Sequence, residues 1–139
     1  MKKRIYLDDV RTPTQGNWVL VKTYEEFIDK VKEVGFDNID YVSLDHDLGD
    51  EAIMEYHTNV APNFKLDYNN IKEKTGLDAA KWLVEQWMNG NSIFKVLTHS
   101  ANPIGSANII GYINNYLKNI EHEQTCVRVR IPSIILNKN

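Results

Sequence analysis

This sequence has one cysteine, no long hydrophobic run and no excess of positive charge. The single cysteine, Cys126, has no partner for an intramolecular disulfide, which is compatible with a reducing compartment. No stretch approaches the roughly 18 apolar residues of a membrane span, and the basic start runs at once into Asp8 and Asp9, unlike a signal peptide. A formal net charge of -3 gives no general attraction for duplex DNA. We therefore expect a cytoplasmic protein that binds neither membrane nor duplex DNA.

The length and composition favour a single globular domain. The chain has 139 residues, of which 42% are hydrophobic and 25% charged, close to ordinary globular usage. It contains no internal repeat, low-complexity tract or linker. We expect one domain over residues 1–139.

Apolar runs alternate with segments of helical periodicity along the chain. Helix starts are indicated by Thr23 and Thr75, each followed three residues later by an acidic side chain that completes a capping box. Such alternation predicts an α/β fold of three layers, with helices on both faces of a mostly parallel five-stranded sheet. The expected strands cover residues 3–7, 18–21, 39–44, 93–97 and 125–131, and the expected helices cover residues 24–34, 77–88 and 106–120.

Two connections do not fit a regular alternation. The first, residues 8–17, is too short for a crossover helix, so either an irregular turn replaces the helix or strand 18–21 is an edge strand of different orientation. The other, residues 50–74, is polar and has neither helical nor strand periodicity. Long inserts of this kind are usually functional, and this one contains Tyr56, Phe64 and Tyr68. We expect it to be the most mobile segment and a lid over the site.

Acidic side chains follow directly after two of the expected strands. Asp8 and Asp9 follow strand 3–7, and Asp45 and Asp47 follow strand 39–44. Because open parallel sheets bind ligands beyond the carboxyl ends of their strands, these carboxylates should converge. Clustered carboxylates repel one another unless a cation lies between them, and oxygen ligands suit Mg²⁺. We expect all four to bind a divalent metal, Mg²⁺ or Mn²⁺, although capping of a turn is the alternative for Asp8 and Asp9.

Two histidines also lie just beyond the ends of expected strands. His46 lies between Asp45 and Asp47, and His99 follows strand 93–97. Imidazole exchanges protons near neutral pH, so we expect at least one of these rings to act as a catalytic acid or base.

Residues that could hold a phosphate lie beside these groups. Arg11 could clamp a phosphate oxygen, although an ion pair with Asp8 or Asp9 is an equal alternative. Free backbone N–H groups at the start of helix 106–120 favour an anion. The further candidates for phosphate binding are Thr98, Ser100, Asn102, Gly105 and Ser106.

Three motifs carry a resemblance to a known family. Residues 6–11 (YLDDVR), 43–49 (SLDHDLG) and 99–105 (HSANPIG) are similar to those of cyclic-phosphate processing receiver-like domains, within the receiver superfamily. The resemblance implies a flavodoxin/receiver-like fold with a shortened first crossover and chemistry on cyclic phosphates. One departure is Ile131-Pro132, which stands where receivers carry a lysine before a proline on the fifth strand.

The leading hypothesis for function is a phosphoesterase that opens a cyclic phosphate, either a 2′,3′-cyclic RNA end or a cyclic nucleotide. Asp45 is assigned to the reacting site together with His46 and His99. Two alternatives stay open: a module that binds cyclic nucleotides without cleaving them, and a divergent signalling receiver phosphorylated on Asp45. The missing lysine argues against the receiver. Neither oligomeric state nor pathway follows from the sequence.

Overall fold

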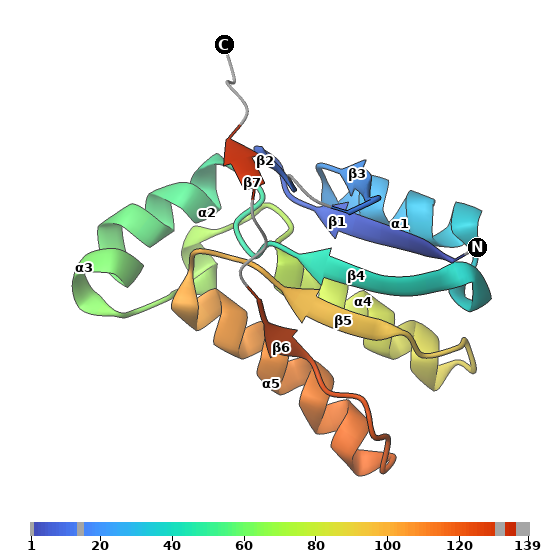
Figure 1. Cartoon of the computed structure of the whole chain (residues 1–139). Coiled ribbons are helices and arrows are strands. Elements are labelled where there is room, and N and C mark those ends of the chain that lie inside the picture. The colour runs from blue at the N-terminus through green and yellow to red at the C-terminus, as the bar shows by residue number, and fades with distance from the viewer. Residues whose placement is uncertain (1, 14–15, 130–132, 136–139) are drawn as a thin grey trace.

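The computed structural model describes residues 2–13, 16–129 and 133–135. Its main sheet has five strands, all parallel, in the order β3-β1-β4-β5-β6 (Figure 1). This confirms the predicted receiver-like α/β class, because it is the flavodoxin-type order in which the second strand lies outside the first. The strands are β1 (Lys3–Leu7), β3 (Val19–Val21), β4 (Ile39–Leu44), β5 (Lys95–Thr98) and β6 (Val127–Arg128).

Three long helices connect the strands: α1 (Tyr24–Val34), α4 (Gly76–Met88) and α5 (Pro103–Asn119). Both threonines cap their helices, but the full capping box forms at Thr75 and not at Thr23, where Glu26 accepts the N–H of Lys22. Thr23 Oγ1 accepts the N–H of Glu26 at 3.1 Å, and Thr75 builds a capping box with Asp78. A short 3-10 turn, η1 (Phe36–Asn38), follows α1. The last long helix begins at Pro103, earlier than the expected residue 106, because Asn102 serves as its cap.

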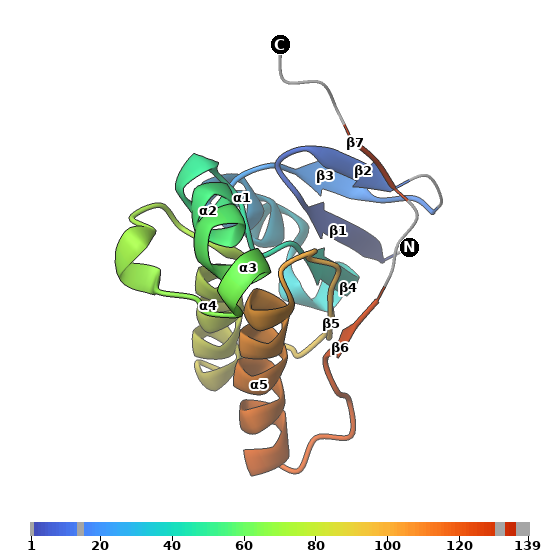
Figure 2. The same ribbon diagram turned by 90° about the vertical axis from the view of Figure 1, so that its left-hand side faces the viewer.

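The hydrophobic core lies between the sheet and these three helices. Buried side chains from alternate strand positions meet apolar stripes of α1, α4 and α5 in one cluster. Figure 2 shows the helices gathered on the same side of the sheet. The prediction of three layers is therefore wrong for the described residues, which form two. Right-handed crossovers from β3 through β4 and β5 to β6 all step in one direction, so they place their helices on one face.

The opposite face of the sheet carries aromatic side chains. Trp18 packs edge-on against Tyr6 at 5.5 Å and against Tyr41 at 5.3 Å between ring centroids. These contacts leave Tyr6 only 1% exposed although no helix among the described residues lies over it. Trp18 is therefore a packing residue.

The first crossover contains a strand in place of a helix. After β1 the chain forms β2 (Arg11–Pro13), which pairs antiparallel with β7 (Ser133–Ile135) in a separate two-stranded sheet. The chain then enters β3 parallel to β1, at the edge of the main sheet. Neither alternative holds as stated: a strand, and not an irregular turn, takes the place of the helix, and the edge strand β3 keeps the parallel orientation. The expected fifth strand is shorter than predicted, and its last residues, Arg130 and Ile131, lie outside the described residues together with Pro132.

The insert after β4 is helical, contrary to its lack of sequence periodicity. It lies beyond the carboxyl ends of the strands in Figure 1. Its elements are α2 (Asp50–Glu55), the π-helical turn η2 (Tyr56–Val60), α3 (Ala61–Asn63) and the 3-10 turn η3 (Tyr68–Asn70). Its mobility stays a prediction.

One buried carboxylate holds the insert together. Glu55 is 3% exposed and accepts hydrogen bonds from the side chains of Asn59 and Asn70 and from the backbone N–H of Asp67. Hydrogen bonding to the charged form lowers the pKa of Glu55, with the Asp67 backbone bond as the largest cause. Glu55 thus links α2 to η2 and to the segment at η3 through hydrogen bonds.

No helix within the described part of the chain combines the length and apolar character needed to cross a bilayer.

Candidate functional site

The tips of the three central strands bring the expected site residues into one row. Beyond each strand, the ladder continues by one hydrogen bond: the N–H of Asp45 donates to Leu7 O at 2.9 Å, and the N–H of His99 donates to Leu44 O at 3.1 Å. Asp8 is held in the same way by the edge strand β3, through Val21 O. The expected convergence of Asp8, Asp45 and His99 is therefore confirmed.

Three carboxylates form an acidic group at this edge. One oxygen from each of Asp8, Asp9 and Asp45 lies within 4.8 Å of the others. Asp45 is 2% exposed, and among the described residues its Oδ1 atom has no hydrogen-bond partner, although a hydrogen bond from the Ser100 side chain acts to lower the pKa of the carboxyl. A buried, unpaired carboxylate oxygen is costly unless a cation or hydrogen bond compensates it. The residues therefore fit a divalent cation held by oxygen ligands.

Local geometry holds Asp8 in its ionised form. Its Oδ1 accepts the backbone N–H groups of Val10 and Arg11 at 2.9 and 2.8 Å, so the carboxylate also caps the turn after β1. Burial acts to raise the pKa of Asp8, but the hydrogen bond from His99 and these two backbone bonds lower it below the ordinary 3.8. The expected capping and metal-binding roles are thus compatible in one side chain.

The pKa of Asp45 is shifted in the opposite direction from that of Asp8. Burial, followed by repulsion from the Asp8 charge, raises its pKa to about 8, although Arg11 acts to lower it. Arg11 Nε lies 3.4 Å from Asp8 Oδ2, and its Nη2 lies 3.8 Å from Asp45 Oδ2. A quarter of the Arg11 side chain is exposed, so Arg11 lies where this edge meets solvent. It thus makes the expected ion pair and stays accessible to an anion.

His99 is enclosed between two polar neighbours. Its Nε2 lies 3.1 Å from Asp8 Oδ2 and its Nδ1 lies 2.7 Å from Ser43 Oγ, while the ring stacks on Tyr6 with centroids 4.1 Å apart. Burial lowers the pKa of His99 below 6.5, against the opposing effect of Asp8. Both ring nitrogens are occupied, so neither faces solvent.

His46 and Asp47 lie on the other side of the strand tips. His46 is fully buried, with Nδ1 2.6 Å from Asp47 Oδ1 and Nε2 2.9 Å from the Tyr68 hydroxyl. Asn102 donates a second hydrogen bond to Asp47 Oδ1 at 3.2 Å. The structure therefore brings Asp47 to His46 and not into the group formed by the other three carboxylates.

The residues expected to bind phosphate build the loop between β5 and α5. Each is buried and bonded within the protein, so the structure gives them a role in shaping the loop, while Arg11 stays accessible. Thr98 Oγ1 donates to Leu44 O, the Asn102 N–H donates to Ser100 Oγ, the Gly105 N–H donates to Asn102 Oδ1, and Ser106 Oγ donates to Ser100 O.

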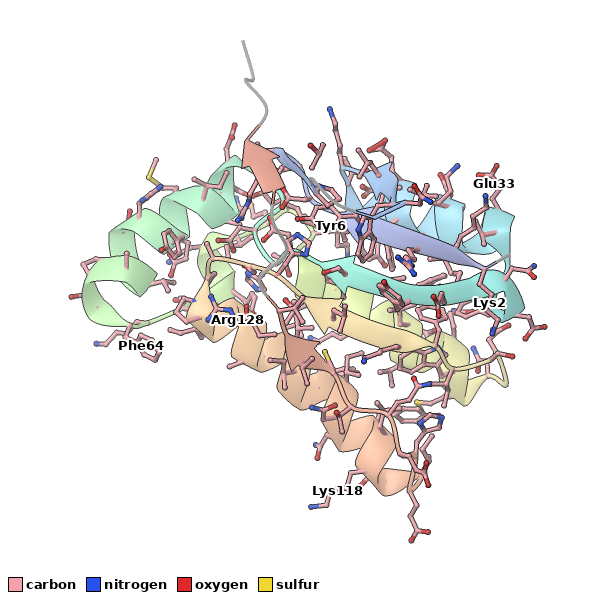
Figure 3. The ribbon with its side chains drawn as sticks, in the orientation of Figure 1. Lys2, Tyr6, Glu33, Phe64, Lys118 and Arg128 are labelled. Atoms are coloured by element: carbon pink, nitrogen blue, oxygen red, sulfur yellow. The ribbon has the colours of Figure 1, made fainter. Side chains whose placement is uncertain are left out.

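Two residues near the site, Ser43 and Arg128, were not identified from the sequence, and Tyr68 was expected there only as part of the lid. Ser43 bonds to His99, Tyr68 bonds to His46, and Arg128 donates from Nη2 to Ser100 O at 2.8 Å. Figure 3 shows Arg128 close to the first turns of α5. Its register opposite Thr98 could have been predicted by aligning the strand ends, whereas the contacts of Ser43 and Tyr68 depend on side-chain directions.

Comparison with known proteins agrees with the motifs. No curated protein and no solved structure matches the chain. The family model of the cyclic-phosphate processing receiver domain matches residues 3–115, which include the acidic group, both histidines and the insert. The chain therefore belongs to the cyclic-phosphate processing receiver domain family.

Proposed function

We propose that the protein is a metal-assisted phosphoesterase that hydrolyses a cyclic phosphodiester, either a 2′,3′-cyclic RNA end or a cyclic nucleotide. The observation that carries the proposal is the group of Asp8, Asp9 and Asp45, with its unpaired, buried Asp45 Oδ1 and with Arg11 at its margin. Family membership supports the substrate class. The three carboxylates would hold Mg²⁺ or Mn²⁺, which polarises phosphoryl oxygens and activates water.

The reaction adds one water molecule to the cyclic phosphate. The water oxygen forms a bond to phosphorus, the bond from phosphorus to one ribose oxygen breaks, and that oxygen receives a proton. The product is a phosphomonoester. A guanidinium at the entrance suits the charge on the phosphoryl oxygens, so Arg11 is assigned to bind them.

The proton transfers are assigned to His46 acting with Asp47. The His46 ring is buried, but its partner Asp47 keeps 13% of its side chain exposed and so provides the accessible end of the pair. General acid–base groups typically contribute about 10²–10⁴-fold to rate, and we expect His46→Ala to lose turnover in that range. Because such groups act mainly in the transition state, substrate affinity should change much less.

The test is a product assay with Mn²⁺ or Mg²⁺ on three probes: an RNA oligonucleotide with a 2′,3′-cyclic end, a 3′,5′-cyclic mononucleotide and a cyclic dinucleotide. Hydrolysis in ¹⁸O-water should place one ¹⁸O atom in the phosphomonoester product, as detected by mass spectrometry. Asp45→Asn should abolish turnover. The matched control is Asp40→Asn, which changes a carboxylate on the same strand that is ion-paired with Arg4 away from the site.

Two outcomes would overturn the proposal. Tight binding of a cyclic nucleotide without product, in the presence of metal, would make the protein a binding module. Stable phosphorylation of Asp45 by a small phosphodonor, without hydrolysis of any cyclic probe, would make it a signalling receiver.

A further inference from the structure

His99 occupies a chain of hydrogen bonds that runs from the sheet into the acidic group. Ser43 Oγ lies 2.7 Å from His99 Nδ1, and His99 Nε2 lies 3.1 Å from Asp8 Oδ2. All three side chains are buried, with Ser43 fully so. Strand β4 supplies the serine, β1 leads into the aspartate and β5 leads into the histidine.

The chemistry of the three groups sets the direction of this chain. An ionised carboxylate only accepts hydrogen bonds, so His99 Nε2 must carry a proton and donate it to Asp8. In the neutral ring, Nδ1 is then an acceptor, and the Ser43 hydroxyl donates to it. Within the described residues, the buried Ser43 hydroxyl has this hydrogen bond to His99.

Packing fixes the ring as firmly as the hydrogen bonds do. The His99 ring lies parallel to Tyr6, with an interplanar angle of 10°, and Tyr6 is backed by Trp18. The ring therefore cannot rotate without breaking this stack. Such an arrangement is suited to holding Asp8, the direct partner of Nε2, in one orientation.

We propose that Ser43 and His99 are positioning residues, which together orient the Asp8 carboxylate for metal binding. The inference rests on the proposed metal site but needs no turnover. Partners of this kind, one step outside the metal ligands, typically change metal affinity by about 10–100-fold when they are removed.

The experiment measures Mn²⁺ affinity directly, by calorimetry on the full chain without substrate. His99→Ala should weaken Mn²⁺ binding about 10–100-fold. In His99→Gln, the amide N–H₂ can replace Nε2–H as donor to Asp8, so affinity should return toward the wild-type value. Ser43→Ala should weaken binding, and because it removes the donor to Nδ1, the tautomer that carries the proton on Nε2 should be less strongly favoured and the His99 Hε2 NMR signal should broaden.

Val42→Ala is the matched control. Val42 is the neighbour of Ser43 on the same strand and is fully buried, but its side chain belongs to the core on the helix side of the sheet. The substitution should lower the melting temperature and leave Mn²⁺ affinity unchanged.

Equal Mn²⁺ affinity in the wild type, His99→Ala and Ser43→Ala would overturn the inference and leave the proposed function intact. A loss in Val42→Ala as large as in Ser43→Ala would also overturn it, because affinity would then follow stability. Absence of Mn²⁺ binding to the wild type would overturn both proposals.

Discussion

Asp45→Asn should change how the stability of the metal-free protein depends on pH. In the folded protein, burial and then Asp8 raise the pKa of Asp45 from 3.8 to about 8. A raised pKa contributes stability that is fully present below the ordinary pKa and is lost as pH rises through the folded value. The wild type should therefore become less stable as pH rises across this interval, whereas Asp45→Asn lacks the titrating group.

The loss of stability caused by Asp45 is best measured between about pH 6.5 and about pH 8.5. Below this range His99 acts in the opposite sense, because burial lowers its pKa from 6.5, so its contribution is lost as pH falls. At 1.36 kcal/mol for each unit, and with the Asp45 pKa at about 8, the wild type should lose about 2 kcal/mol across this range. For a domain of this size, that corresponds to about 6 °C in melting temperature.

The assay is a series of thermal melts in EDTA, for the wild type and Asp45→Asn at matched pH values. The melting temperature of the wild type should fall more steeply than that of the variant. Asp40→Asn, which removes an exposed carboxylate of the same strand, should follow the wild type. Parallel curves for the wild type and Asp45→Asn would refute the reasoning, because they would show that folding does not perturb this carboxyl.

Three further predictions concern the metal, the loop after β5 and the insert. Millimolar Mg²⁺ or Mn²⁺ should raise the melting temperature of the wild type, because binding at 100 times the dissociation constant adds about 2.7 kcal/mol to the free energy of unfolding. The melting temperature of Asp45→Asn should not change. Gly105→Ala should cost more than about 2 kcal/mol in denaturant unfolding, because its Cβ would overlap the buried His46 ring. Gly111→Ala in the same helix has open space and should be neutral or stabilising by up to about 1 kcal/mol. Glu55→Ala should speed hydrogen exchange throughout residues 56–70 and leave the core strands protected, and unchanged exchange in the insert would show that Glu55 is not its organising centre.

The order of elements and the position of the site could be predicted because both depend on local signals. Apolar runs that end in carboxylates identify strands and their tips, and parallel strands bring such tips to one edge. The capping-box patterns at Thr23 and Thr75 likewise placed two helix starts correctly. These features need no knowledge of contacts between distant residues.

The arrangement of the layers could have been predicted from the sequence, but only with an argument from the topology of the sheet. A helix on the second face could come from the first crossover, which residues 8–17 are too short to supply. The handedness of the other crossovers then assigns all three long helices to a single face. Expecting helices on both faces gave too little weight to that short connection.

Side-chain partners in the site and the structure of the insert could not be predicted. Asp47 follows the same strand as Asp45, yet it binds His46 and Asn102 because the chain turns at the strand tip. The insert lacks apolar periodicity, and its Glu55 makes hydrogen bonds to residues up to 15 positions away. Hydrogen bonds of this kind leave no repeating pattern in the sequence.

The pairing of β2 with β7 has a consequence for the order in which the molecule assembles. The partners Arg11 and Ile135 have the longest sequence separation of any paired strand residues described. The entropic cost of closing a loop grows with its length, and contacts between distant residues slow folding. We therefore expect the five-stranded sheet to form first and the backbone of Arg11 to be fixed last. A folding intermediate would then already hold the three carboxylates together before the arginine at their margin is secured.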